Sequence, residues 1–215
     1  MQHRTKRAIR RFERTWRPLW ISSAGIALLL SIGLFAAEKL RPLVTGQLLI
    51  SEAQAASKTI PAEISVCFTP EEECEDLIVG HIERANREIL VMAYTFTAKP
   101  IMDALLRAQA RGVTIEVIMD AKAAEQRYSM ALPLQMARIP LWLDSSVAIM
   151  HNKILIMDRQ TVITGSYNLS KAAASKNAEN VVTMNGGAAI ARPFIDNFSR
   201  RKAAAERVIA RQGKQ

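Results

Sequence analysis

Short apolar runs alternate with longer amphipathic stretches along this chain from residue 64 onward. Runs typical of buried strands lie at 64–68, 88–96, 113–120, 140–143, 154–157, 161–164 and 180–184. Stretches that favour helices lie between them, at 71–86, 99–111, most of 121–137, 169–175 and 188–207. Strands that alternate with helices in this way predict an α/β domain whose parallel or mixed sheet is flanked by helices.

An uncharged apolar segment at residues 21–37 precedes this pattern. Its 17 residues are at the lower limit for a membrane-spanning helix, and its uniform hydrophobicity fits a membrane better than a soluble core helix. Seven basic residues precede it, so the positive-inside rule leaves the N-terminus in the cytoplasm and exports the rest. Ala53-Gln54-Ala55 resembles a signal-peptidase site but lies farther along than usual, so cleavage stays open. We expect a basic leader (1–20), a transmembrane or signal segment (21–37), a linker (38–60) and a folded domain (61–215).

The formal charge of +9 is concentrated at the two ends of the chain. Residues 1–20 carry +6 and residues 200–215 carry +5, whereas residues 59–199 hold 13 basic and 16 acidic side chains, a net charge of −3. The high isoelectric point therefore does not by itself predict a nucleic-acid partner. Any attraction for phosphate must come from local clustering of basic groups.

The stretch from His151 to Asp158 contains the first candidate chemistry. Side chains alternate along a strand, so His151 and Lys153 should point to the same side, roughly 6–7 Å apart. A buried lysine needs a carboxylate or a bound anion, because burying an unpaired charge costs several kcal/mol. Asp158 has the opposite parity and would face the other way. A bound anion is therefore the favoured partner of Lys153.

A possible anion site follows directly along the chain. Gly165 and Ser166 end the next predicted strand, and Asn168 is expected to open the helix at 169–175. Helix starts present unpaired N–H groups and a partial positive charge, which suit phosphate. Ser166 and Asn168 can each cap that helix or donate a hydrogen bond to a ligand. An ordinary strand edge followed by a capped helix is the alternative, which the whole set at this spacing disfavours.

The pattern HxKxxxxD, followed after six residues by GSxN, resembles the HKD signature of the phospholipase D superfamily. It comprises His151, Lys153, Asp158, Gly165, Ser166 and Asn168, with Glu179 and Asn180 in the place of that family's usual acidic residue. Together with the stretches 67–70, 93–97 and 111–113, the motif makes the chain similar to the small bacterial endonucleases of that superfamily. The resemblance covers residues 64–198 and implies a phospholipase D-like α/β sandwich from a bacterium. The basic leader and the apolar segment predict that this domain lies in the bacterial periplasm, exported or anchored to the inner membrane.

The resemblance implies phosphodiester cleavage through a phosphohistidine. His151 would attack phosphorus, Lys153, Ser166 and Asn168 would stabilise the phosphoryl oxygens, and Glu179 would hold the histidine in its reactive tautomer. Asp158 belongs to the signature, but its parity suggests that it orders the strand turn without touching phosphate. No paired-carboxylate site accompanies the motif, so we expect a reaction without metal or cofactor. Because the chain carries the signature once, the resemblance also implies a homodimer that shares the active site.

The substrate is less closely defined than the reaction. We favour a nuclease that acts on DNA or RNA with little sequence preference. A lipid phosphodiesterase is the alternative, and the membrane segment supports it. A third interpretation, a binding module with a decayed site, is disfavoured because His151, Lys153, Asn168 and Glu179 are intact.

Two cysteines, Cys67 and Cys74, lie seven positions apart. In an exported domain they are a candidate disulfide that would join the first strand to its helix. Two free buried thiols are the alternative, and zinc is disfavoured because no pair of histidines accompanies them. His3 and His81 are expected to be structural or solvated.

Overall fold

The computed structural model describes residues 60–208, which form most of a compact unit extending from Thr59 to Gln215. Its centre is an eight-stranded sheet in the order β1-β7-β6-β5-β2-β3-β4-β8. β2, β3 and β4 are parallel and the other neighbouring pairs are antiparallel, which confirms the predicted mixed sheet. The strands are β1 (Glu63–Thr69), β2 (Glu88–Ala93), β3 (Thr114–Asp120), β4 (Leu141–Asp144), β5 (Lys153–Met157), β6 (Thr161–Gly165), β7 (Glu179–Asn185) and β8 (Glu206–Arg207).

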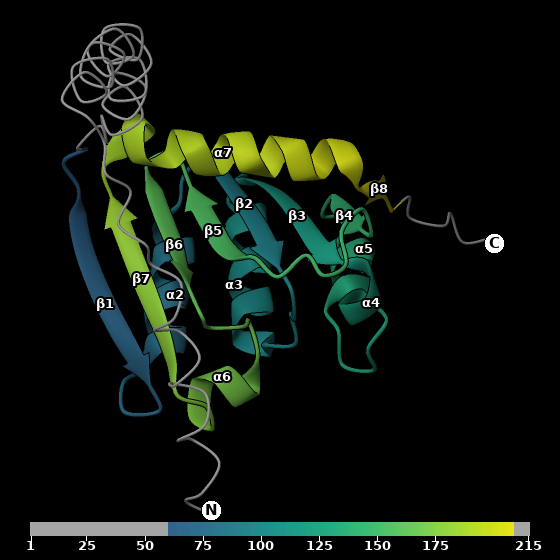
Figure 1. Cartoon of the computed structure of the whole chain (residues 1–215), viewed down its shortest axis with the longest axis horizontal. Helices are drawn as coiled ribbons and strands as arrows, with labels where there is room; N and C mark the ends of the chain where they lie inside the picture. Colours follow the sequence, from purple (N-terminus) through teal and green to yellow (C-terminus); the bar gives the residue numbers. More distant parts are fainter. Residues whose placement is uncertain (1–59, 209–215) are drawn as a thin grey trace, which may run out of the picture. The chain divides into compact units, whose positions relative to one another are not determined.

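Helices cover both faces of the sheet (Figure 1). Alternate residues of β5 show the division, because Leu155 and Met157 pack on the side of α2 and α3 whereas Ile154 and Ile156 pack on the side of α7. β5 is therefore buried on both faces, as its continuous apolar run predicts. The helices are α2 (Cys74–Arg84), α3 (Lys99–Ala110), α4 (Ala121–Ala124), α5 (Ala131–Met136), α6 (Lys171–Ser175) and α7 (Gly187–Ala204).

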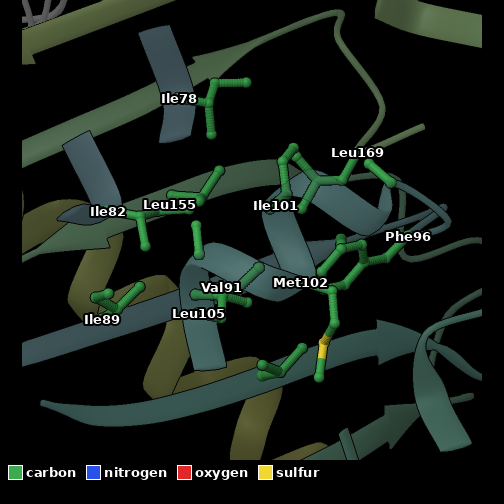
Figure 2. Packing of buried hydrophobic residues seen from close by; sticks show 14 of the residues in the cluster. Ile78, Ile82, Ile89, Val91, Phe96, Ile101, Met102, Leu105, Leu155 and Leu169 are labelled. Atoms are coloured by element: carbon green, nitrogen blue, oxygen red, sulfur yellow. The ribbon is translucent and has the colours of Figure 1, made fainter. Parts of the chain in front are cut away.

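The larger core cluster lies between the sheet and the helices α2 and α3 (Figure 2). At one end of it Phe96, just beyond β2, lies beside Leu169, just beyond β6, and the two residues form an isolated parallel bridge. Both are almost fully buried, and burial of apolar side chains of this size contributes about 1.5–3 kcal/mol each. The core therefore anchors the two segments that follow β2 and β6.

Several of the predicted helices differ from the structure. The closing helix expected at 188–207 ends at Ala204, because residues 206–207 pair with β4 as the strand β8. The helix expected at 71–86 begins only at Cys74, because Glu72 turns back and its Oε2 accepts a hydrogen bond from the Phe68 N–H at 2.6 Å. The helix expected over most of 121–137 is two short helices, α4 and α5. The chain leaves the helical path between them, where the Met130 N–H donates to the Phe96 carbonyl at 2.8 Å. Apolar periodicity registers neither the local bond from Phe68 to Glu72 nor the long-range bond from Met130 to Phe96.

Cys67 and Cys74 are joined by a disulfide in the structure, with their Cα atoms 5.7 Å apart. The bond connects the end of β1 to the first residue of α2. Glu72 lies beside the two sulfur atoms, and these three residues are the one group of potential metal ligands within the described range. The sulfur atoms are committed to the disulfide, so the group is not a usable ligand set.

Within residues 60–208, none of the helices is both long and apolar enough to cross a bilayer. The predicted leader, the apolar segment at 21–37 and the linker up to residue 59 lie outside the described residues.

Candidate active site

One edge of the sheet brings together strand ends that are far apart in the sequence. The parallel strands β2, β3 and β4 finish there, β5 begins there, and the register pairs Ala93 with Lys153. On the other side, β6 ends and β7 begins at the same edge, and Thr69 at the end of β1 pairs with Glu179. The polar residues of the HKD pattern at this edge come from the segments that flank β5, β6 and β7.

His151 lies at this edge, on the segment that leads into β5, and it is exposed. Its imidazole packs against the Tyr94 ring, with centroids 4.7 Å apart and an interplanar angle of 53°. The main chain on either side is held by the Tyr94 N–H, which donates to the Asn152 carbonyl at 3.0 Å, and by the Met150 N–H, which donates to Oδ2 of buried Asp120 at 2.9 Å. His151 is therefore accessible on a fixed backbone, as a nucleophile requires.

Lys153 lies beneath this histidine and is only 8 % exposed. Its Nζ donates to the His151 carbonyl at 2.9 Å and lies 5.2 Å from the Tyr94 ring centroid. Burial lowers the pKa of Lys153, and the attraction of Glu179 only partly opposes this shift. No ion pair within residues 60–208 includes Lys153. A buried cation without a carboxylate in direct contact is suited to a substrate anion.

Ser166 is fixed by a reciprocal set of bonds with Asn180. The Ser166 N–H donates to the Asn180 carbonyl at 3.1 Å and to its Oδ1 at 2.7 Å, while the Asn180 N–H donates to Ser166 Oγ at 3.0 Å. Gly165 has a φ of 150°, and a Cβ at that position would overlap the Asn180 carbonyl oxygen. Because Gly165 has no Cβ, its backbone can approach the Asn180 backbone closely, and this approach orients Ser166. The Ser166 hydroxyl keeps its own proton free to donate.

Glu179 is hydrogen-bonded to two residues, Asn177 and Thr69, that are not part of the HKD pattern. Asn177 Nδ2 donates to Glu179 Oε1 at 2.9 Å, and the Glu179 N–H donates to Thr69 Oγ1 at 3.2 Å. The Thr69 hydroxyl in turn donates to the Asn177 carbonyl at 3.0 Å. Thr69 belongs to a stretch that contributes to the family resemblance, but its hydrogen bonds join positions more than 100 residues apart. Spacing along the chain does not reveal such a contact.

Asn168 does not open a helix, so the predicted helix start at this position is wrong. Leu169 is extended, because its carbonyl accepts from the Thr97 and Ala98 N–H groups at 2.7 and 2.9 Å. The helix begins two residues later, at Lys171, where Ser170 Oγ accepts from the Ala173 N–H. Asn168 Oδ1 is buried without a hydrogen-bond partner in the described part of the chain. The expected anion site on the helix terminus is thus replaced by an extended segment.

The neighbouring Tyr167 is also buried, and its hydroxyl likewise has no partner among residues 60–208. Burial, reinforced by the negative charges of Glu75 and Glu179, raises the pKa of Tyr167 far above its usual value. The phenol therefore stays protonated at any physiological pH, and its side chain packs in the core.

Asp158 lies at the opposite end of β5 from His151, so the structure does not bring it to the cluster. Its carboxylate accepts hydrogen bonds from the N–H groups of Asn86, Arg87 and Glu88 at 3.0, 2.8 and 3.0 Å. Burial alone would raise the pKa of Asp158, but these hydrogen bonds and the charge of Arg87 lower it below its usual value. The residue has a φ of 53° and shapes the turn between β5 and β6.

Among the predicted site residues, the structure therefore brings His151, Lys153, Ser166, Asn168 and Glu179 to one edge of the sheet, on the segments that flank β5, β6 and β7. An exposed imidazole beside a buried ammonium, with hydroxyl and amide donors nearby, provides the groups that phosphodiester cleavage needs.

A comparison with known protein families agrees with this class of reaction. The model described as "Cardiolipin synthase, PLD-like domain" matches residues 78–202.

Relatives and solved structures give the same result. "Phospholipase D" from Rickettsia felis is 37% identical over 147 residues, which cover 68% of this chain and 73% of that protein. "Mitochondrial cardiolipin hydrolase" from Mus musculus is 27% identical over 198 residues, covering 86% and 89%. The crystal structure of Nuc from Salmonella typhimurium, a phospholipase D family member, matches with 35% identity and a TM-score of 0.66, covering 69% of this chain and 99% of Nuc. The chain belongs to the phospholipase D superfamily and is a phosphodiester hydrolase.

Proposed function

We propose that this phosphodiesterase is an endonuclease with little sequence preference, which cleaves DNA and also accepts RNA. The observation that carries the proposal is the exposed His151 above the buried, unpaired Lys153 on an open edge of the sheet. Lys171 and Lys176, at the two ends of α6, support a polyanionic substrate. Both are exposed beside the Ser166 and Glu179 segments, and neither forms an ion pair within residues 60–208. They can contact phosphates on either side of the scissile one.

The proposed reaction has two steps. A ring nitrogen of His151 attacks phosphorus and forms a P–N bond, the P–O bond to the leaving group breaks, and the leaving oxygen takes a proton from a general acid. Water then gives a proton to that same group, now a base, and attacks phosphorus, so that the P–N bond breaks and His151 is restored. Lys153, Ser166 and Asn168 stabilise the phosphoryl oxygens. No metal ion is needed in this proposal, because these side chains supply both the nucleophile and the positive charge.

A second copy of the chain supplies the acid in this proposal. His81 lies in the last turn of α2, which leads to the start of β2 at the opposite edge of the sheet, so it does not reach the His151 site. The partner's His151 would fill the role on a two-fold axis. Mixing His151→Ala with wild-type subunits should then give severely impaired heterodimers. Activity that falls only in proportion to the mutant fraction would contradict a shared site.

The basic leader, the apolar segment at 21–37 and the Cys67–Cys74 disulfide support a periplasmic location for the domain, anchored at or exported across the inner membrane. A reporter fused after Gln215 tests this part of the proposal. Activity of an export-dependent reporter supports it, and activity confined to a cytoplasm-dependent reporter contradicts it.

A lipid phosphodiesterase is the second candidate, and one feature of the structure favours it. Val147 and Ile149, shortly before His151, are 40 % and 56 % exposed and could contact acyl chains. The names of the two relatives above also refer to lipid phosphodiesters.

Assays of the purified full-length protein on plasmid DNA and on phosphatidylcholine or cardiolipin vesicles decide between the two. Nicking and linearisation of plasmid in the presence of EDTA, with no release of headgroup or phosphatidic acid, is the expected result. Headgroup release without DNA cleavage would overturn the nuclease proposal. Loss of both activities with EDTA, restored by magnesium, would overturn the metal-free mechanism.

A further inference from the structure

Tyr94 contacts both of the reactive groups at the site, although the mechanism above does not use it. We propose that Tyr94 is a positioning residue for phosphodiester hydrolysis, whose aromatic face, and not its hydroxyl, orients the His151 imidazole and stabilises the Lys153 ammonium. The proposal rests on the role proposed for His151, but it is independent of whether the substrate is a nucleic acid or a lipid.

The backbone around Tyr94 places its ring close to both groups. The Tyr94 N–H donates to the carbonyl of Asn152, the residue between His151 and Lys153, at 3.0 Å, which continues the β2–β5 ladder by one step. Two residues further, Phe96 is buried in the core beside Leu169 (Figure 2). The segment that carries the ring is therefore hydrogen-bonded to the segment that leads into β5 at one end and packed in the core at the other.

The distances suit an electrostatic role for the ring. The centroid separation of 4.7 Å from the His151 imidazole lies within the range of attractive aromatic pairs, and Lys153 Nζ at 5.2 Å from the centroid is within cation–π distance. The negative face of the ring stabilises the ammonium, which no carboxylate in the described part of the chain contacts directly. The ring is tilted by 53° to the imidazole. Among residues 60–208 no hydrogen bond engages either imidazole nitrogen, so both are available for phosphorus and for a carboxylate.

The hydroxyl of Tyr94 does not share in this role. Among residues 60–208 it forms no hydrogen bond, and the contacts to His151 and Lys153 both involve the ring. If Tyr94 only filled space next to the core, an aliphatic side chain of similar size would serve equally well. The proposal and that simpler role therefore predict different results for phenylalanine and leucine at position 94.

The test compares Tyr94→Phe with Tyr94→Leu in the full-length protein on bis(p-nitrophenyl) phosphate, a diester that is neither nucleic acid nor lipid. Tyr94→Phe should keep kcat within about twofold, whereas Tyr94→Leu should lose about tenfold to a hundredfold in kcat with little change in KM, because a misoriented nucleophile costs that much. The titratable groups around Lys153 are His151, Tyr94 and Glu179. Without the ring the ammonium is less stable, so the alkaline limb of the Tyr94→Leu pH profile should move to lower pH.

Fluorinated phenylalanines at position 94 provide a series that keeps the shape of the ring while weakening its negative face. Activity should fall steadily with fluorination at an unchanged melting temperature, even if Tyr94→Leu folds poorly. Wild-type kcat and pH profile in Tyr94→Leu, or full activity across the fluorinated series, would overturn the inference. Equal impairment of Tyr94→Phe and Tyr94→Leu would assign the role to the hydroxyl instead.

His151→Ala on the same diester separates this inference from the mechanism on which it rests. If His151→Ala is inactive but Tyr94→Leu has wild-type activity, only the role proposed for Tyr94 is refuted. An active His151→Ala would refute the nucleophile, and with it both proposals.

Discussion

The two ends of β5 carry the two halves of the HKD pattern, and their surroundings differ sharply. At the start of the strand, His151 is exposed and the Lys153 ammonium is buried, with no carboxylate of residues 60–208 in direct contact. At the far end, three backbone N–H groups donate to the Asp158 carboxylate. Polar groups at the first end have bonding capacity left for a ligand, whereas those at the second end are satisfied by the protein. We propose that the start of β5, the chemical end, takes part in the reaction, and that its far end, the architectural end, supports the fold.

His151→Ala should have the largest effect, at the chemical end. Loss of a nucleophile lowers kcat by on the order of 10⁴-fold or more. Because the imidazole is exposed and its removal leaves no buried group unpaired, the free energy of unfolding should change little. Steady-state kinetics together with chemical denaturation check both parts. A large loss of stability in this variant would show that His151 also supports the fold, which would contradict the proposed difference between the two ends of β5.

Asp158→Ala should show the opposite profile. It leaves three N–H groups without their acceptor, and for a partly exposed carboxylate we expect a loss of about 2–3 kcal/mol in the free energy of unfolding. The kcat of the folded fraction should stay within about threefold of wild type. Asp158→Asn, which keeps one acceptor oxygen, is the matched control and should lose less. A kcat reduced a hundredfold in a fully folded Asp158→Ala would assign the residue to the chemistry.

The pH dependence of this stability difference has a defined sign. The pKa of Asp158 is lower in the folded protein than in the unfolded chain. Its contribution is therefore fully present above the unfolded pKa, near 4, and is lost as the pH falls through the folded pKa. The gap in unfolding free energy between wild type and Asp158→Ala should be constant near neutral pH and shrink below about pH 4. A gap that widens on acidification would contradict the assignment.

Thr69→Val tests the support behind the chemical end and should have the smallest effect. The substitution keeps the shape but removes the bonds to the Asn177 carbonyl and the Glu179 N–H. We expect kcat to fall about threefold to tenfold, because Glu179 loses part of its orientation. Thr69→Ser keeps the hydroxyl and should restore activity. Equal activity in the two variants would show that these bonds do not affect Glu179.

The contrast also shows what the sequence can and cannot predict. Apolar runs separated by amphipathic stretches predicted seven of the eight strands and the mixed sheet, because most of these strands bury apolar side chains and so leave a local pattern. The spacing of His151 and Lys153 predicted that both lie at one end of β5, because side chains alternate along a strand. The parity of Asp158 indicated that it faces away, but the three N–H groups that it binds lie about 70 residues earlier in the chain.

Most of the misses come from bonding between distant segments. The late start of α2 is the exception, because Glu72 bonds to Phe68 only four residues away. Leu169 is extended because its carbonyl accepts from the segment after β2, whereas its sequence favours a helix. The two-residue strand β8 exists only through its pairing with β4. Thr69 and Tyr94 lie in the stretches 67–70 and 93–97 that contribute to the family resemblance, but their contacts to the site depend on the sheet register. Local propensity carries no information on such contacts.

The most direct test of the central claim is to trap the intermediate on the chemical end of β5. The full-length protein is quenched with acid-free denaturant during turnover of a phosphodiester, digested, and analysed by mass spectrometry. The account predicts a phosphoryl adduct on the peptide that contains His151, present in wild type and in Asp158→Ala and absent in His151→Ala. Turnover without any adduct on His151, or an adduct that disappears in a folded Asp158→Ala, would contradict it.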